Sequence, residues 1–188
     1  SAEQELINNG VVAVGDICNT NDSFELKTNN RVHYHSFMEA YGILPQKAGE
    51  VFGKAHELYL QATELGLSVS ISPHAPYTCS VELLDKINQF SGNKGKPLTI
   101  HNQESQPEDD LFRFGNGELA DFYHELGVDI SFFHSVGRSS LEWLLPLLPA
   151  KQKILLVHNT FTSINDMKVA LVNPVDLYWC LCPKANPT

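Results

Sequence analysis

The stretch Pro97-Leu-Thr-Ile-His-Asn-Gln-Glu104 begins as a short apolar run and ends in polar, chemically reactive side chains. Three other apolar runs end in the same way. They are Leu67 to Ser72 before Pro73-His74, Lys153 to Val157 before His158-Asn159, and Asp176 to Cys182 before Pro183-Lys-Ala-Asn186. Short apolar runs of this length are typical of strands that are buried on both faces of a parallel sheet. This repeated pattern decides the predicted fold.

Amphipathic segments separate the apolar runs. The longest, from Gln46 to Leu65, places apolar residues along one stripe, which predicts a helix that ends before Gly66. Ser80 occupies an N-cap position before the next helix. Strands that alternate with helices indicate parallel pairing, because a parallel connection needs a crossover helix. We predict helices at 46–65, 80–90, 118–126, 141–148 and 164–172, strands at 11–17, 31–38, 67–72, 97–101, 153–158 and 176–182, and a strand or loop at 128–134.

The composition is that of an ordinary globular domain. The 188 residues are 19% charged and 43% hydrophobic, and the formal net charge is -9. An acidic chain is a poor candidate for binding nucleic acid, because affinity for phosphates needs clustered Lys and Arg. No stretch approaches the apolar length of a membrane span, and residues 1–10 do not resemble a signal peptide. We therefore expect a single domain over residues 1–188 of a cytoplasmic protein that acts on a small molecule, without nucleic acid or membrane.

None of the four cysteines forms a Cys-x-x-Cys pair. We expect buried, reduced thiols, as is usual in a cytoplasmic protein. A cysteine metal site is the alternative.

The polar strand ends predict one common site, because the carboxyl ends of parallel barrel strands converge on one rim. A single histidine in such a place is more often a packing residue, but His74, His101 and His158 follow three separate runs. Imidazole is the commonest metal ligand and a common acid–base group. Glu104 can reach over a metal held by His101 and transfer protons between a bound water and a leaving group. Its alternative interpretation is a solvated loop carboxylate.

Four strand ends resemble the amidohydrolase superfamily, and within it the deaminases and chlorohydrolases that act on nucleobases, triazines and related amidines. The motifs occur in the family's order and resemble those of its fourth to seventh strands. They are Pro73-His-Ala-Pro-Tyr-Thr78, His101-Asn-Gln-Glu104, Leu156-Val-His-Asn159 and Cys182-Pro-Lys-Ala-Asn186, where Ala185 replaces the usual serine.

The resemblance implies a role for each of these residues. His101 would bind the metal, Glu104 would transfer the proton, and His158 would orient the attacking water or the substrate. The implied substrate-binding residues are His74, Tyr77 and Asn186. The implied cofactor is one divalent metal, zinc or iron, in the full-length protein. The implied activity is that of an aminohydrolase, a deaminase of a nucleobase- or nucleoside-like substrate such as an aminofutalosine or adenosine derivative.

Two parts of the family pattern have no counterpart here. The family carries a His-x-His metal pair on its first strand and a metal-binding aspartate on its eighth. The resemblance therefore implies an α/β fold that is a partial (β/α)8 TIM barrel of about strands 2 to 7, lacking the first and last strands. With one family ligand retained, we expect the isolated chain to bind no metal and to be inactive. Open strand edges invite pairing, so we also expect a homo-oligomer.

Two alternatives stay open. His33-Tyr-His35 has His-x-His spacing on an expected strand and could supply two ligands from one face, although the family has no metal pair on that strand. The chain could also be a non-catalytic, degenerate barrel domain that serves as a binding or assembly module.

Overall fold

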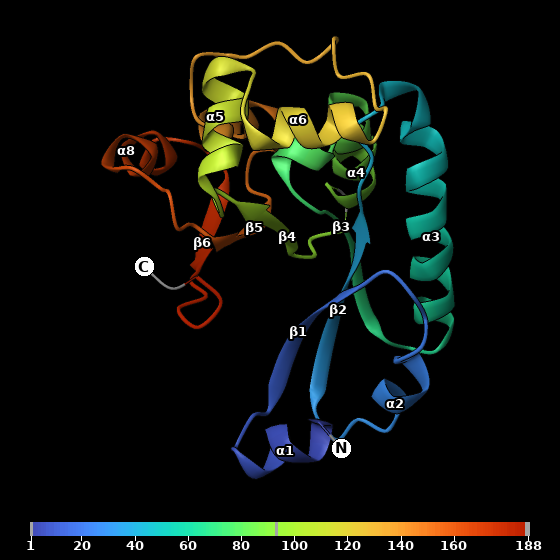
Figure 1. Ribbon diagram of the computed structural model, residues 1–188. Helices are drawn as coiled ribbons and strands as arrows, with labels where there is room; N and C mark the ends of the chain where they lie inside the picture. Colours follow the sequence, from blue (N-terminus) through green and yellow to red (C-terminus); the bar gives the residue numbers. More distant parts are fainter. Residues whose placement is uncertain (1, 93, 187–188) are drawn as a thin grey trace.

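The computed structural model describes residues 2–92 and 94–186, and these form six strands and eight α-helices (Figure 1). The strands are β1 (Ala13–Cys18), β2 (His33–Ala40), β3 (Ser68–Pro73), β4 (Leu98–Asn102), β5 (Lys153–His158) and β6 (Asp176–Cys180). The helices are α1 (Ala2–Asn8), α2 (Phe24–Thr28), α3 (Ala48–Glu64), α4 (Val81–Ser91), α5 (Gln106–Phe114), α6 (Glu118–Glu125), α7 (Ser140–Leu144) and α8 (Ile164–Leu171). Short 3-10 turns lie at Pro45–Lys47, Pro76–Thr78 and Leu145–Leu147.

All strand pairs are parallel, which confirms the predicted α/β class. The segment 128–134 contains no strand, and β6 ends at Cys180 rather than at 182. Helices α1, α2 and α5 were not predicted. They are short. Helix α5 begins Gln106-Pro107, and the first helical turn accommodates this proline because no N–H is needed there for a bond within the helix.

The strands form two three-stranded sheets, β1-β2-β3 and β4-β5-β6. Serine side chains join the sheets: the Ser70 hydroxyl donates to the carbonyl of Pro97 over 2.7 Å, and the Thr99 N–H donates to the Ser72 hydroxyl over 3.1 Å. At the carboxyl end of this junction, the His101 N–H donates to the carbonyl of His74. The carboxyl ends of the two sheets therefore meet.

Helices cover the sheets and bury the core. Helix α3 runs beside β2 and β3 (Figure 1) and presents Ala48, Ala55 and Ala62 as its buried face. Ser80 caps α4 as expected, since its hydroxyl accepts from the Leu83 N–H over 3.2 Å. Gly66 follows α3 in the left-handed conformation, with φ of +72°, as predicted for a residue that terminates a helix.

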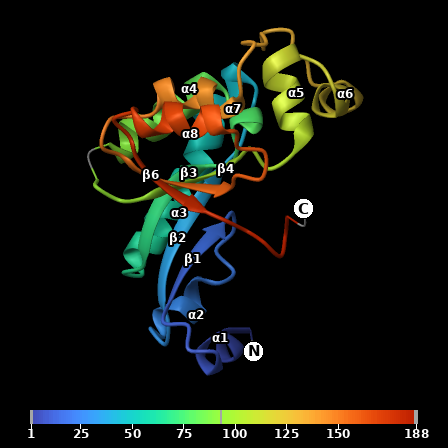
Figure 2. The same ribbon diagram turned by 90° about the vertical axis from the view of Figure 1, so that its left-hand side faces the viewer.

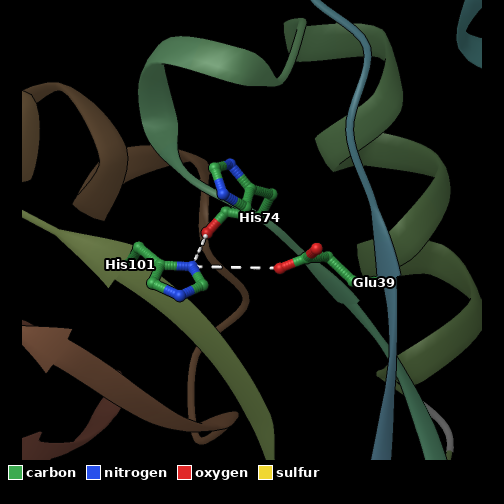
Figure 3. Close-up of side chains that lie close together, drawn as sticks. All are labelled: Glu39, His74 and His101. Atoms are coloured by element: carbon green, nitrogen blue, oxygen red, sulfur yellow. Dashed lines mark hydrogen bonds and ion pairs between the residues drawn. The ribbon is translucent and has the colours of Figure 1, made fainter. Parts of the chain in front are cut away.

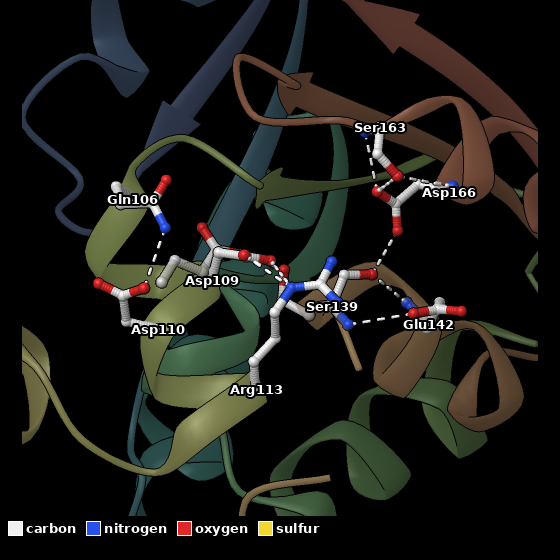
Figure 4. A network of polar contacts seen from close by, with 10 residues as sticks. Gln106, Asp109, Asp110, Arg113, Ser139, Glu142, Ser163 and Asp166 are labelled. Carbon is white, nitrogen blue, oxygen red and sulfur yellow. Dashed lines mark hydrogen bonds and ion pairs between the residues drawn. The ribbon is translucent and has the colours of Figure 1, made fainter. Parts of the chain in front are cut away.

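Helices α7 and α8 lie together beside the second sheet (Figure 2), and a polar network ties their first turns (Figure 4). Ser139 caps α7 and Ser163 caps α8, each in a capping box. The Ser139 hydroxyl also donates to the carboxylate of Asp166, which belongs to the α8 capping box. The start of α7 is thereby fixed.

The four cysteines are free thiols. Cys18 and Cys79 are buried, as expected, but Cys180 is exposed and Cys182 is only partly covered, because β6 is an edge strand. The expectation of buried thiols was wrong for this second pair. In the described part of the chain, no helix is long and apolar enough to cross a membrane.

Candidate active site

Three histidines gather where the two sheets meet. His74 directly follows β3, His101 lies near the end of β4, and His158 is the last residue of β5. The ring centroids of His74 and His101 are 4.8 Å apart, and those of His101 and His158 are 5.3 Å apart. The parallel register explains this grouping, because it aligns the carboxyl ends of neighbouring strands.

The rings of His74 and His101 are each held through Nδ1. His74 Nδ1 lies 2.8 Å from the Thr78 hydroxyl, and His101 Nδ1 lies 2.8 Å from the carbonyl oxygen of His74. That carbonyl accepts the backbone N–H of His101 as well, also over 2.8 Å. A carbonyl can only accept, so Nδ1 is the donor; in the neutral ring the lone pair then lies on Nε2, the arrangement that metal-binding imidazoles use. Burial, followed by the nearby His101, lowers the pKa of His74 to about 4, which keeps its ring neutral.

Glu39, near the end of β2, faces these two histidines (Figure 3). Its Oε1 lies 3.9 Å from His101 Nδ1, and its Oε2 accepts from the Asn19 amide over 3.3 Å. Burial raises the pKa of Glu39, while His101 and the Asn19 bond lower it. Each of Glu39, His74 and His101 offers one ligand atom within 4.8 Å of the others. Glu39 was not among the residues named from the sequence, because the sequence analysis identified a single metal ligand, His101.

Glu104 and His158 form a second pair beside the first group. Glu104 Oε1 lies 3.3 Å from His158 Nε2, and His158 Nδ1 lies 2.7 Å from the side-chain oxygen of Asn186. The amide oxygen accepts, so Nδ1 carries a proton. His158 Nε2 is then the ring nitrogen that faces the Glu104 carboxylate.

The backbone at these strand ends adopts the left-handed conformation that residues other than glycine rarely occupy. The φ angles are +47° at Gln103, +76° at His158 and +61° at Asn159. The buried Asn102 donates its side-chain amide to Asn159 over 3.0 Å, which links the two turns. Such conformations cost free energy and cluster at functional sites.

Tyr77 lies on the same rim, in the turn after β3. Its ring meets that of His74 edge-on, with centroids 6.0 Å apart. Burial, and then the carboxylates of Glu108, Glu104 and Glu39, raise the pKa of Tyr77 to about 12, so its phenol stays protonated and can donate a hydrogen bond. All six residues named from the sequence thus lie on the rim where the two sheets meet.

The His-x-His pair of β2 lies elsewhere. His33 and His35 sit at the amino end of the strand, whereas Glu39 sits at the carboxyl end. Both ring nitrogens of His35 already bond serine hydroxyls, those of Ser68 at 2.8 Å and Ser70 at 3.0 Å. His33 is exposed. The structure therefore does not bring this pair to the histidine cluster.

Known proteins are similar to this chain in sequence and in structure. No family model matches the chain. The chain is 35% identical over 159 residues to an aminodeoxyfutalosine deaminase from Deinococcus radiodurans, covering 80% of this chain and 38% of that protein. It is 32% identical over 120 residues to a 5'-deoxyadenosine deaminase from Methanopyrus kandleri, covering 61% of this chain and 26% of that protein. Among solved structures, Helicobacter pylori aminofutalosine deaminase in complex with methylthio-coformycin superposes with a TM-score of 0.83, at 21% identity, over 98% of this chain and 45% of that one.

The chain belongs to the amidohydrolase superfamily.

Other structural neighbours of this amidohydrolase chain agree in fold. Guanine deaminase from C. acetobutylicum with bound guanine gives a TM-score of 0.69 at 17% identity, over 97% of this chain and 42% of that one. The amidohydrolase chain thus spans less than half the length of the relatives and structures that it matches.

Proposed function

We propose that this amidohydrolase chain carries the catalytic rim of a metal-dependent deaminase that acts on an adenosine-like nucleoside. The observation that carries the proposal is the Glu104–His158 contact beside the His74 and His101 rings. The named activities of its relatives support the substrate class. Its six strands would be the second to seventh of an eight-stranded barrel, which is the arrangement expected from the sequence.

The donor set fits a divalent metal. His101 would hold the metal through Nε2, and the Glu39 carboxylate offers a second ligand atom in the same group. Nitrogen and carboxylate ligands suit zinc and iron. A bound divalent metal supplies a Lewis acid and lowers the pKa of a coordinated water.

The chain's own residues move the protons. Glu104 would take a proton from the attacking water on its carboxylate and deliver it to the departing amino group, which leaves as ammonia. His158 would hold the water or the substrate by its Nε2, since Asn186 fixes the ring through Nδ1. One site can therefore supply both the base and the acid of the reaction.

The substrate would lie against the β3 side of the rim. His74 and Tyr77 present an imidazole and a protonated phenol from the same turn, and both are suited to hydrogen-bonding a nucleobase or a sugar. Asn186 would contribute from beyond β6.

The test is an assay of the full-length protein for ammonia release from adenosine, 5'-deoxyadenosine, aminofutalosine, guanine and cytosine. We expect the adenine nucleosides to be turned over, and activity to fall on treatment with a metal chelator. Turnover of none of these substrates by a metal-loaded preparation would refute the proposal.

A specific surface favours the alternative of an assembly module. A groove of about 580 Å³ between α8 and β6 is lined mainly by apolar side chains, among them Met167, Leu171 and Trp179. Apolar surface of this kind favours association. An inactive full-length protein that forms stable oligomers would support this second function.

A further inference from the structure

A fully buried carboxylate lies behind the rim and takes no part in the proposed chemistry. Glu108, in the first turn of α5, is 0% exposed. Its Oε1 accepts the backbone N–H of Gln103 over 3.0 Å, and its Oε2 accepts the backbone N–H of Glu104 over 3.1 Å. The hydroxyl of Ser140 also donates to Oε1. Each oxygen is therefore committed to the turn that carries Glu104.

This arrangement uses a carboxylate in a way that other side chains cannot match. Two N–H groups from consecutive residues need two acceptors on one rigid plane, and a carboxylate provides them. The start of α5 also favours negative charge. Burial raises the pKa of Glu108 to about 7, whereas the bonds from Ser140, Gln103 and Glu104 lower it.

The backbone that Glu108 holds is strained. Gln103 has a φ of +47°, and a residue with a side chain persists in that conformation only where its surroundings fix it. The Ser105 side chain makes no capping bond at the start of α5, and the Glu108 carboxylate accepts the N–H groups of the two residues before Ser105. Without these two bonds, the turn could relax and carry Glu104 away from His158.

We propose that Glu108 is a positioning residue, whose buried carboxylate fixes the turn at Gln103 and Glu104 and so keeps the Glu104 side chain beside His158. The inference rests on the proposed role of Glu104 as the proton carrier.

Ser140, the third donor to the Glu108 carboxylate, is itself held in place. It is the first residue of α7, and the capping box of Ser139 together with Asp166 holds the start of that helix (Figure 4). Helices α5 and α7 therefore meet at the carboxylate of Glu108. The position of the catalytic turn is set by two helices rather than by its own loop.

The test is Glu108→Gln in the full-length protein, with Glu82→Gln as the control. Glu82 is also in the first turn of a helix, α4, but is exposed. Glutamine keeps the shape but offers one acceptor, and its amide NH2 faces an N–H donor. Because loss of a supporting bond to a catalytic group typically costs about 10- to 100-fold in activity, we expect kcat to fall by that factor. We expect KM to stay within about twofold, because the substrate contacts remain.

Amide hydrogen exchange across residues 102–106 gives a readout that is independent of activity. We expect faster exchange there in Glu108→Gln and unchanged exchange in Glu82→Gln. Unchanged exchange, or a kcat within about twofold of the parent protein, would overturn the inference. If Glu108→Gln does not fold, Ser140→Ala decides by the same two measurements, with a smaller loss expected because both backbone bonds remain. If the parent protein shows no deaminase activity, the proposed function fails. The exchange data still test whether Glu108 fixes the turn at Gln103 and Glu104.

Discussion

Oε1 of Glu104, in the turn after β4, lies 3.3 Å from Nε2 of His158, the last residue of β5. The contact joins an acid to a base whose other nitrogen is already occupied by Asn186. A carboxylate and an imidazole nitrogen are both common acid–base groups in catalysis.

Replacing Glu104 by glutamine should remove the proton carrier and keep the fold. The side chain is partly exposed, so packing changes little. We expect deaminase kcat to fall by about a hundred- to ten-thousandfold, the usual contribution of a general acid–base group. Steady-state kinetics of the full-length protein measure the loss, and elemental analysis checks that the metal is retained. Full activity would leave Glu104 as an ordinary loop carboxylate.

Replacing His158 by alanine should be similarly severe, because it removes the partner of Glu104 and the group expected to orient the attacking water. His56→Ala is the control: this histidine stacks on Phe52 within helix α3, away from the rim. We expect a loss of about a hundredfold or more for His158→Ala and little change for the control. Equal activity of the two variants would contradict the assignment.

The candidate ligand group predicts a graded loss of metal. His101→Ala should bring the metal content of the dialysed full-length protein well below one ion per chain, and Glu39→Gln should weaken metal binding less. His33→Ala serves as the control, since this exposed histidine lies at the other end of β2. Elemental analysis decides the matter. A stoichiometric ion in His101→Ala would move the metal site elsewhere.

His35 predicts a pH dependence of stability. Burial lowers its pKa to about 4, below the ordinary value of 6.5. Between these pH values the unfolded chain binds more protons, so His35 lowers stability as the pH falls from about 6.5 towards 4. After allowance for partial exposure, we expect an effect of about 1 to 2 kcal/mol. Urea unfolding at pH 7 and pH 4.5 should show a smaller loss for His35→Gln than for the parent; equal losses would rule His35 out.

The groove between α8 and β6 predicts self-association. Leu171 is 84% exposed beside it, and Leu181 is 69% exposed. We expect light scattering to give a dimer or larger species, and Leu171→Glu to reduce the measured mass. Leu60→Glu, on the exposed side of α3, is the control, because Leu60 is 47% exposed and far from the groove in sequence. A monomer at high concentration would contradict this prediction.

The strand-end pattern was informative because parallel strands bring their carboxyl ends together whatever the length of the connections. It therefore placed His101 and His158 in one site although a long segment separates them. It missed Glu39, because the expected strand stopped at Met38 and Glu39 stands in no recognised motif. It missed Glu108, because that residue acts on backbone N–H groups, which every residue except proline possesses. A helix cap such as Ser80 can be recognised because it stands at a helix start, whereas a side chain that bonds the backbone of a neighbouring turn, as Glu108 does, forms no motif.

The carbonyl of His74 accepts both the backbone N–H and the ring Nδ1 of His101. A single peptide plane, that between His74 and Ala75, therefore sets the spacing of the two sheets at the rim and the rotation of the His101 ring together. Rotating that plane would release both bonds at once. Ala75 contacts neither the metal nor the substrate in the proposed site. A substitution there that rotates this peptide plane should consequently change the orientation of the His101 imidazole before it changes any other side chain on the rim.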